Sequence, residues 1–216
     1  MEHIFDGGVE EAIQKLENPE RVKRHDPALL FGRVGLRRGE VLADLGCGPG
    51  FFALPAAKSV GKRGRVLAVD KTPEMLKVLR EKLERVGTDN IEVIQADILS
   101  TGIEKGTVDV AFMANTFHDV RGGSLKEVER ILRPSGRLVI LDWKKVPTQA
   151  GPLLEARLTP EEVTTILKGR RWRIAEQFDT GPTHYVVVAR PPTKRHHADR
   201  GAVSSSLKLK RFAVIW

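Results

Sequence analysis

Cysteine is almost absent from this chain of 216 residues, which contains only Cys47. A single thiol excludes an intrachain disulfide, and it excludes a metal site or a reaction that needs several cysteines. Few thiols and no disulfide framework are typical of a reducing compartment, so we expect a cytoplasmic protein.

Long apolar runs are also missing. No stretch reaches the roughly 18 consecutive apolar residues that a membrane-spanning helix requires. The start, residues 1–6, has no basic segment followed by an apolar one, so we do not interpret it as a signal peptide. There is no internal repeat, and the length suffices for one domain with a sizeable core. We therefore expect no membrane span.

Positive charge is concentrated at one end of the chain. The net charge is +8, and residues 193–216 hold six Lys or Arg against one acid, Asp199. We interpret residues 192–216 as a basic, disordered tail. Such a tail can contact nucleic acid, but it is more often simply solvated, so a nucleic-acid partner is not favoured. The apolar end, residues 212–216, can dock on the domain or on a second subunit, which leaves the oligomeric state open.

The most informative stretch is a strand that turns through glycines into a helix. Residues 41–45 are an apolar run, Gly46, Gly48 and Gly50 follow at alternate positions, and residues 51–60 have a mostly apolar helical pattern. Glycine allows positive φ and lets a ligand approach the backbone closely. The N–H groups at such a helix start attract negative charge. This pattern predicts a cofactor cradle.

Acidic residues follow the next two predicted strands. Residues 65–69 end at Asp70, about 20 residues beyond the glycine turn, where dinucleotide-type folds place the acid that holds ribose hydroxyls. Residues 91–96 end at Asp97. The glycine spacing is G-x-G-x-G and not the G-x-G-x-x-G of nicotinamide sites, which makes a nicotinamide dehydrogenase a distant alternative.

The helix between these two strands has clear boundaries. Thr72 is expected to cap it, Pro73 suits its first position, and Gly87 ends it. Apolar residues at helical spacing from Met75 to Val86 are expected to face the core.

These motifs resemble those of the class I S-adenosylmethionine-dependent methyltransferases. The resemblance rests on residues 43–50, Val69-Asp70, residues 96–98, and residues 132–137 leading into a strand. It covers roughly residues 25–190, and within the family the chain looks most like the small-molecule, type 11 or UbiE-like group. It implies an α/β, Rossmann-like fold with a seven-stranded, mostly parallel sheet, a C-terminal antiparallel hairpin and helices on both faces.

The resemblance also implies that the chain consists of three segments. Residues 1–39 would form an N-terminal helical cap, residues 40–191 the cofactor-binding methyltransferase domain, and residues 192–216 the tail. Asn18 and Asp26, each followed by proline, are expected to begin helices in the cap.

The cofactor implied by the resemblance is S-adenosylmethionine. Asp44 would contact its ammonium through water, Asp70 its ribose, Asp97 the adenine amine, and the Ile98 N–H a ring nitrogen. An acid at a strand end is also commonly just a turn cap. No metal site is predicted. The residues placed against the cofactor are Asp44, Gly46, Cys47, Gly48, Gly50, Phe52, Asp70, Lys71, Asp97, Ile98 and Asn115.

The loop after the fourth predicted strand, residues 115–119, would lie beside the transferable methyl group. It lacks the Asn-Pro-Pro-aromatic motif of enzymes that methylate exocyclic adenine or glutamine nitrogens. His118 is a candidate general base, since the pKa of free histidine is near 6.5, and Asp119 would orient it or balance its charge. The alternative is a positioning hydrogen bond to the cofactor or the loop.

The acceptor pocket would be built from the N-terminal helices and the segment after the fifth strand. Phe5, His25 and Phe31 are candidate lining residues, although ordinary helix packing explains them as well. Trp143 follows the fifth strand and can line the pocket or stand at its rim. None of these segments contains a motif that identifies the acceptor.

The leading prediction is in-line transfer of the sulfonium methyl to a small-molecule acceptor. One alternative keeps the cofactor and makes RNA or protein the acceptor, with the basic tail as a docking arm. Another is a non-catalytic cofactor-binding module that regulates a partner.

Overall fold

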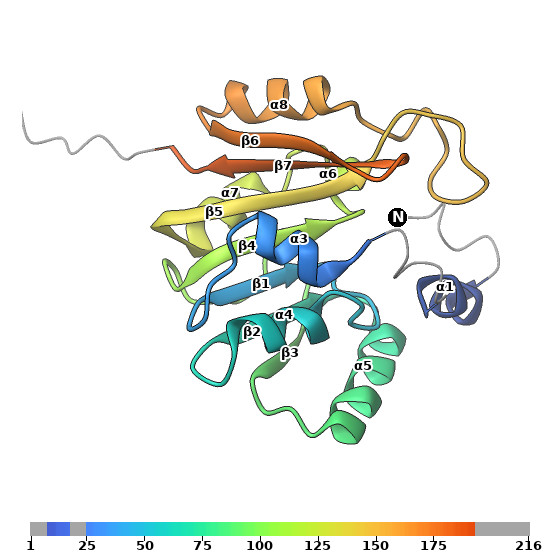
Figure 1. Ribbon diagram of the computed structural model, residues 1–216, viewed down its shortest axis with the longest axis vertical. Helices are drawn as coiled ribbons and strands as arrows, with labels where there is room; N and C mark the ends of the chain where they lie inside the picture. The colour runs from blue at the N-terminus through green and yellow to red at the C-terminus, as the bar shows by residue number, and fades with distance from the viewer. Residues whose placement is uncertain (1–7, 18–24, 193–216) are drawn as a thin grey trace, which may run out of the picture.

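The protein, seen in a computed structural model that describes residues 8–17 and 25–192, is built on one seven-stranded sheet. The strand order is β3-β2-β1-β4-β5-β7-β6 (Figure 1). Adjacent strands from β3 to β5 are parallel, and β7 is antiparallel to both of its neighbours. The predicted fold class, including the C-terminal hairpin, is confirmed.

The described strands are β1 (Val41–Leu45), β2 (Arg65–Asp70), β3 (Ile91–Gln95), β4 (Val108–Ala114), β5 (Leu132–Trp143), β6 (Arg173–Thr180) and β7 (His184–Arg190). The described helices are α1 (Gly8–Glu17), α3 (Pro27–Arg33), α4 (Ala53–Val60), α5 (Pro73–Val86), α6 (Phe117–Val120), α7 (Leu125–Ile131) and α8 (Pro160–Gly169).

Apolar side chains fill a layer on each face of the sheet. Successive residues of a strand point to opposite faces. Leu42 and Phe112 therefore pack with α3, α4 and α5, whereas Ala43 and Met113 pack with α6, α7 and α8. Both layers are needed because the central parallel strands are buried on both sides.

Some helix boundaries follow the expected capping chemistry. The Asp26 carboxylate accepts hydrogen bonds from the N–H groups of Ala28 and Leu29, at 2.9 and 3.1 Å. Thr159 and Glu162 form a reciprocal capping box at the start of α8. Gly87 ends α5 in the left-handed conformation. The predicted start at Asn18 lies outside the described residues.

Three local predictions need correction. Thr72 is the N-cap residue of α5 as predicted, but its side chain makes no capping bond, because its N–H donates to Asp70 instead. Val86, the last residue of α5, is 55% exposed and packs in neither core layer. The predicted loop at residues 115–119 contains the short helix α6.

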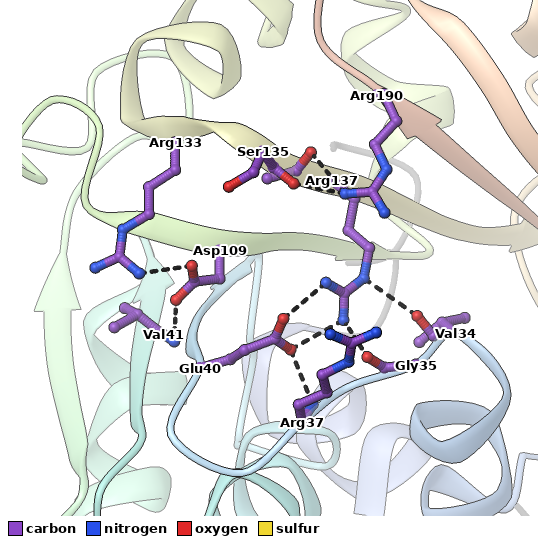
Figure 2. Close-up of polar contacts among 11 residues, drawn as sticks. Val34, Gly35, Arg37, Glu40, Val41, Asp109, Arg133, Ser135, Arg137 and Arg190 are labelled. Atoms are coloured by element: carbon purple, nitrogen blue, oxygen red, sulfur yellow. Dashed lines mark hydrogen bonds and ion pairs between the residues drawn. The ribbon is translucent and has the colours of Figure 1, made fainter.

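The amino ends of the strands are tied together by arginines (Figure 2). The buried Arg137 donates to Glu40 and to the carbonyls of Val34 and Gly35. The Arg137 network links the segment after α3 to β5 and occupies this end of the sheet with paired groups. In Figure 1, α1 and the long loop after β5 lie at the other end, where the parallel strands finish.

Candidate active site

A cavity of about 430 Å³ opens at the carboxyl ends of the parallel strands. Open α/β sheets place their ligands at this edge. Its walls come from α1, the glycine turn after β1, the end of β2, residues 97–98, residues 114–119, Trp143 and residues 149–152. The volume lies in the range of small-molecule and cofactor sites.

The glycine turn forms one wall, and its conformation requires glycine. Gly46, Gly48 and Gly50 have φ of +84°, +52° and +86°. A Cβ on Gly46 would lie 2.7 Å from the Thr116 hydroxyl, and one on Gly50 would overlap Leu79. The turn therefore packs closely against its neighbours while Gly46 and Gly48 face the cavity.

Asp70 lines the cavity and also shapes the turn. Its carboxylate accepts from the Gly48 N–H and from the Thr72 N–H, both at 2.9 Å. These bonds leave acceptor capacity on both oxygens, since a carboxylate has about four lone-pair sites. Lys71 lies beside it in the same wall. The structure thus places the predicted ribose-binding acid at the cavity, and its role there remains a prediction.

Asp97 and Ile98 also lie where the sequence predicted. Both line the cavity, and Ile98 is buried. The Asp97 carboxylate accepts from the Leu99 N–H at 2.9 Å, so it caps a turn as well as facing the cavity. The two interpretations of this acid, turn cap and ligand acceptor, are compatible.

Three residues predicted against the cofactor do not line the cavity: Asp44, Gly50 and Phe52. Asp44 is 1% exposed at the end of β1. The Phe52 ring packs against Phe31 and Phe112, with centroids 6.3 and 5.1 Å apart. Phe52 lies in the core because α4 begins just after it and turns this side toward the sheet. Phe31 is also a core residue, because α3 turns its ring toward Phe112. Phe5 lies outside the described residues.

Cys47 is a buried thiol in the cavity wall. Burial, together with the carboxylates of Asp44 and Asp70, raises the pKa of the Cys47 thiol far above its usual range. The side chain is therefore a neutral, compact group and not a nucleophile.

The His118 side chain is hydrogen-bonded to Asp142, which was not predicted as its partner. Its Nδ1 lies 2.7 Å from Oδ1 of Asp142, and its N–H donates to Oδ2 of Asp142 at 3.0 Å. The Trp143 N–H also donates to Asp142, at 2.8 Å. A carboxylate accepts only, so Nδ1 carries the proton and Nε2 has the free lone pair. Asp142 therefore holds the ring at Nδ1, and the predicted Asp119 lies on the Nε2 side, where its charge acts on the ring.

The other ring nitrogen of His118, Nε2, is buried beside Asp119. Within the described residues, Nε2 has no hydrogen-bond partner, and it is 3.6 Å from Oδ1 of Asp119. Burial opposes the charged form of His118, but the hydrogen bond and charge of Asp142 and the charge of Asp119 outweigh it, so the pKa of His118 lies above its usual value. Asn115, predicted beside it, also lines the cavity and has a positive φ of 56°.

Aromatic rings stand beside His118 at the far end of the cavity from Asp70. Trp143 and His25 line it, and His184 at the start of β7 lies between them, with centroids 4.0 and 4.1 Å away. The sequence predicted His25 and Trp143 as candidates, but gave no signal for His184, which reaches the site through the pairing of β7 with β5.

Helix α1 covers the glycine turn. Ala12, Lys15 and Leu16 line the cavity. Lys82 of α5 fixes the helix by binding both Glu17 and the Pro49 carbonyl of the turn. No group of three His, Cys, Asp or Glu side chains in residues 8–17 and 25–192 could hold a metal ion. Within the same ranges, none of the helices combines the length and apolarity needed to cross a membrane.

Comparisons with known proteins agree with this geometry. A family model described as a methyltransferase domain matches residues 43–140. The crystal structure of a SAM dependent methyltransferase from Aquifex aeolicus is 33% identical, with a TM-score of 0.79, over 83% of this chain and 96% of that one.

Curated relatives match the same region. A demethylmenaquinone methyltransferase from Lactococcus lactis is 32% identical over 124 residues, 56% of this chain and 49% of the relative. A ubiquinone/menaquinone biosynthesis C-methyltransferase UbiE from Klebsiella pneumoniae is 33% identical over 114 residues, 51% of this chain and 45% of the relative. The chain spans about half the length of these relatives. Its glycine turn, strand order and similarity to the Aquifex enzyme show that it belongs to the S-adenosylmethionine-dependent methyltransferases.

Proposed function

We propose that this protein transfers the sulfonium methyl of S-adenosylmethionine to a small-molecule acceptor. The observation that supports this most is one cavity lined by two chemically different groups of residues. The glycine turn, Asp70 and Asp97 follow β1, β2 and β3, on one side of the sheet, whereas His118 and Trp143 come from the ends of β4 and β5, on the other side. A volume of about 430 Å³ lies in the range of sites for cofactors and small molecules.

The residues of the first group fit S-adenosylmethionine. Gly46 and Gly48 have no side chain where they line the cavity, so the methionine portion can approach the backbone at these two positions. Asp70 would accept from the ribose hydroxyls, Asp97 from the adenine amine, and Ile98 would contact the ring. The cofactor supplies an activated methyl group, so the protein's task is alignment and exclusion of water.

His118 would accept the proton that the acceptor loses. His118 lines the cavity, and because Asp142 holds the proton on Nδ1, the lone pair of the ring is on Nε2. The charge formed on the ring is stabilised by Asp142 and by the nearby Asp119. This role matters most for a hydroxyl acceptor, since a thiol or amine needs less help from a base.

The first test is calorimetric titration with S-adenosylmethionine, S-adenosylhomocysteine and NAD. We expect the two sulfur compounds to bind and NAD not to bind. Tritium from labelled S-adenosylmethionine should then pass to a member of a panel of phenols, amines and thiols. His118→Ala should lower turnover more than cofactor affinity. Binding of NAD alone would contradict the proposal, and binding without transfer to any acceptor would favour a regulatory module.

A further inference from the structure

Arg157 is a buried cation whose donors all serve one loop. The side chain is 3% exposed. A guanidinium has five N–H donors, and here five oxygens accept from it. The acceptors are the carbonyls of Pro152 (3.0 Å), Lys144 (3.3 Å), Val146 (2.6 Å) and Ala150 (3.2 Å), and the hydroxyl of Thr148 (2.6 Å).

The carbonyls of this loop have no helix or strand partners, because residues 144–152 belong to no helix or strand. The bonds from Arg157 provide the partners that secondary structure provides elsewhere. Arg157 supplies partners for four carbonyls of this loop from a single side chain. Burial lowers the pKa of the Arg157 guanidinium, and the nearby negative charge of Asp142 offsets part of this effect.

The same guanidinium connects the loop to Trp143. It lies 5.0 Å from the centre of the indole ring. Gly151 packs so closely on this ring that an added Cβ would be 2.8 Å from two of its carbons. Residues 149–152 and Trp143 then line the cavity, whereas Arg157 itself does not. Arg157 therefore holds this wall in shape from behind, without lining the cavity itself.

We propose that Arg157 is a positioning residue for the methyl acceptor, folding residues 144–152 onto Trp143 so that they form the acceptor wall. This inference rests on the proposed function, because the wall lies at the His118 end of the cavity. Since Trp143, Ala150, Gly151 and Pro152 are apolar or aromatic, the wall selects an apolar part of the acceptor. Lysine cannot replace the arginine, because an ammonium has three donors and no planar fork.

The test compares Arg157→Lys with the wild-type protein. S-adenosylhomocysteine should bind both within about twofold, since the cofactor end is unchanged. Hydrogen exchange in the S-adenosylhomocysteine complex should accelerate at least tenfold in residues 146–152 and stay constant in β1 and β2. For the acceptor found in the panel, KM should rise at least tenfold, with kcat and the KM for S-adenosylmethionine changed less than threefold.

Two further variants separate positioning from general loss of structure. Arg121→Lys is the matched control, because Arg121 is exposed and reaches the carbonyls of Glu155 and Ala156 only at 3.5 and 3.4 Å. It should leave both readouts unchanged. Gly151→Ala keeps Arg157 but adds a methyl group that is too close to the Trp143 ring, so the wall should shift and the acceptor KM should rise.

Each failure has a distinct meaning. Unchanged exchange in Arg157→Lys, or an unchanged acceptor KM, would overturn the inference. So would an equal loss of S-adenosylhomocysteine affinity, which would assign Arg157 to the fold as a whole. If the wild-type protein methylates no compound of the panel, the proposed function fails on its own test. The exchange result then still decides whether Arg157 holds the loop.

Discussion

Replacing Asp142 by asparagine tests the arrangement around His118 most directly. Asp142 accepts three hydrogen bonds, from His118 Nδ1, the His118 N–H and the Trp143 N–H. Asparagine has the same shape but turns one accepting oxygen into a donor. Whichever way the amide is placed, at least one buried donor then faces another donor. The negative charge beside the imidazole is lost as well.

The expected destabilisation has two parts. A buried donor left without an acceptor costs about 1–3 kcal/mol at any pH. The second part depends on pH. Because the pKa of His118 is raised in the folded protein, its contribution to stability is complete below about pH 6.5 and disappears as the pH rises through the folded-state pKa. Asp142→Asn lowers that pKa, and each unit removes about 1.4 kcal/mol at low pH.

Chemical denaturation at pH 5.5 and pH 9 checks this reasoning. The loss of unfolding free energy in Asp142→Asn should be larger at pH 5.5. Imidazole NMR, with His118→Gln to assign the signal, should show a lower pKa for His118. Asp119→Asn is the control and should have a smaller effect, since Asp119 is 3.6 Å from Nε2 and more exposed. An equal loss at both pH values would refute the proposed role of Asp142.

Three other substitutions test separate parts of the structure. Asp70→Ala should abolish most S-adenosylmethionine affinity in calorimetry while the protein still folds, although the loss of two backbone hydrogen bonds should lower its melting temperature. Unchanged affinity would contradict the ribose assignment. Glu127→Gln should cost stability at pH 6, and the difference should vanish as the pH falls from about 4.3 toward 2. The reason is that the Arg130 hydrogen bond lowers the pKa of Glu127 to about 2; a pH-independent difference in urea titrations would count against this. Gly50→Ala should lower the unfolding free energy by about 1–3 kcal/mol, because φ is +86° and the new methyl overlaps Leu79. An unchanged denaturation midpoint would show that the turn relaxes.

Features encoded locally were predictable from the sequence. The glycine turn, the acids after β2 and β3, and the cap at Asp26 depend on neighbouring residues, so spacing was enough to find them. The pairing of Asp142 with His118 was not predictable in this way. His118 is 24 residues away, and the contact exists because β4 and β5 are adjacent.

Long-range packing explains the remaining differences. Nothing near Arg157 in the sequence indicates that it binds a loop 5–13 residues earlier. Phe52 has the position of a ligand contact in the motif, yet its ring is directed by core packing with Phe112. Which aromatic residues meet a ligand depends on how whole elements lie against one another, and periodicity alone does not contain that information.

The antiparallel strand β7 has a consequence for how such a site can diversify. Because β7 runs against β5, its first residue, His184, stands at the same edge as Trp143, the last residue of β5. The proposed acceptor side thus draws on residues near positions 25, 118 and 150, with His184 packed against His25 and Trp143, whereas the proposed cofactor side is drawn mainly from one continuous stretch, residues 46–98. Substitutions in the hairpin turn or the loop after β5 can alter what is methylated while the methyl donor's half stays intact, so one scaffold can acquire new acceptors by small, separate steps.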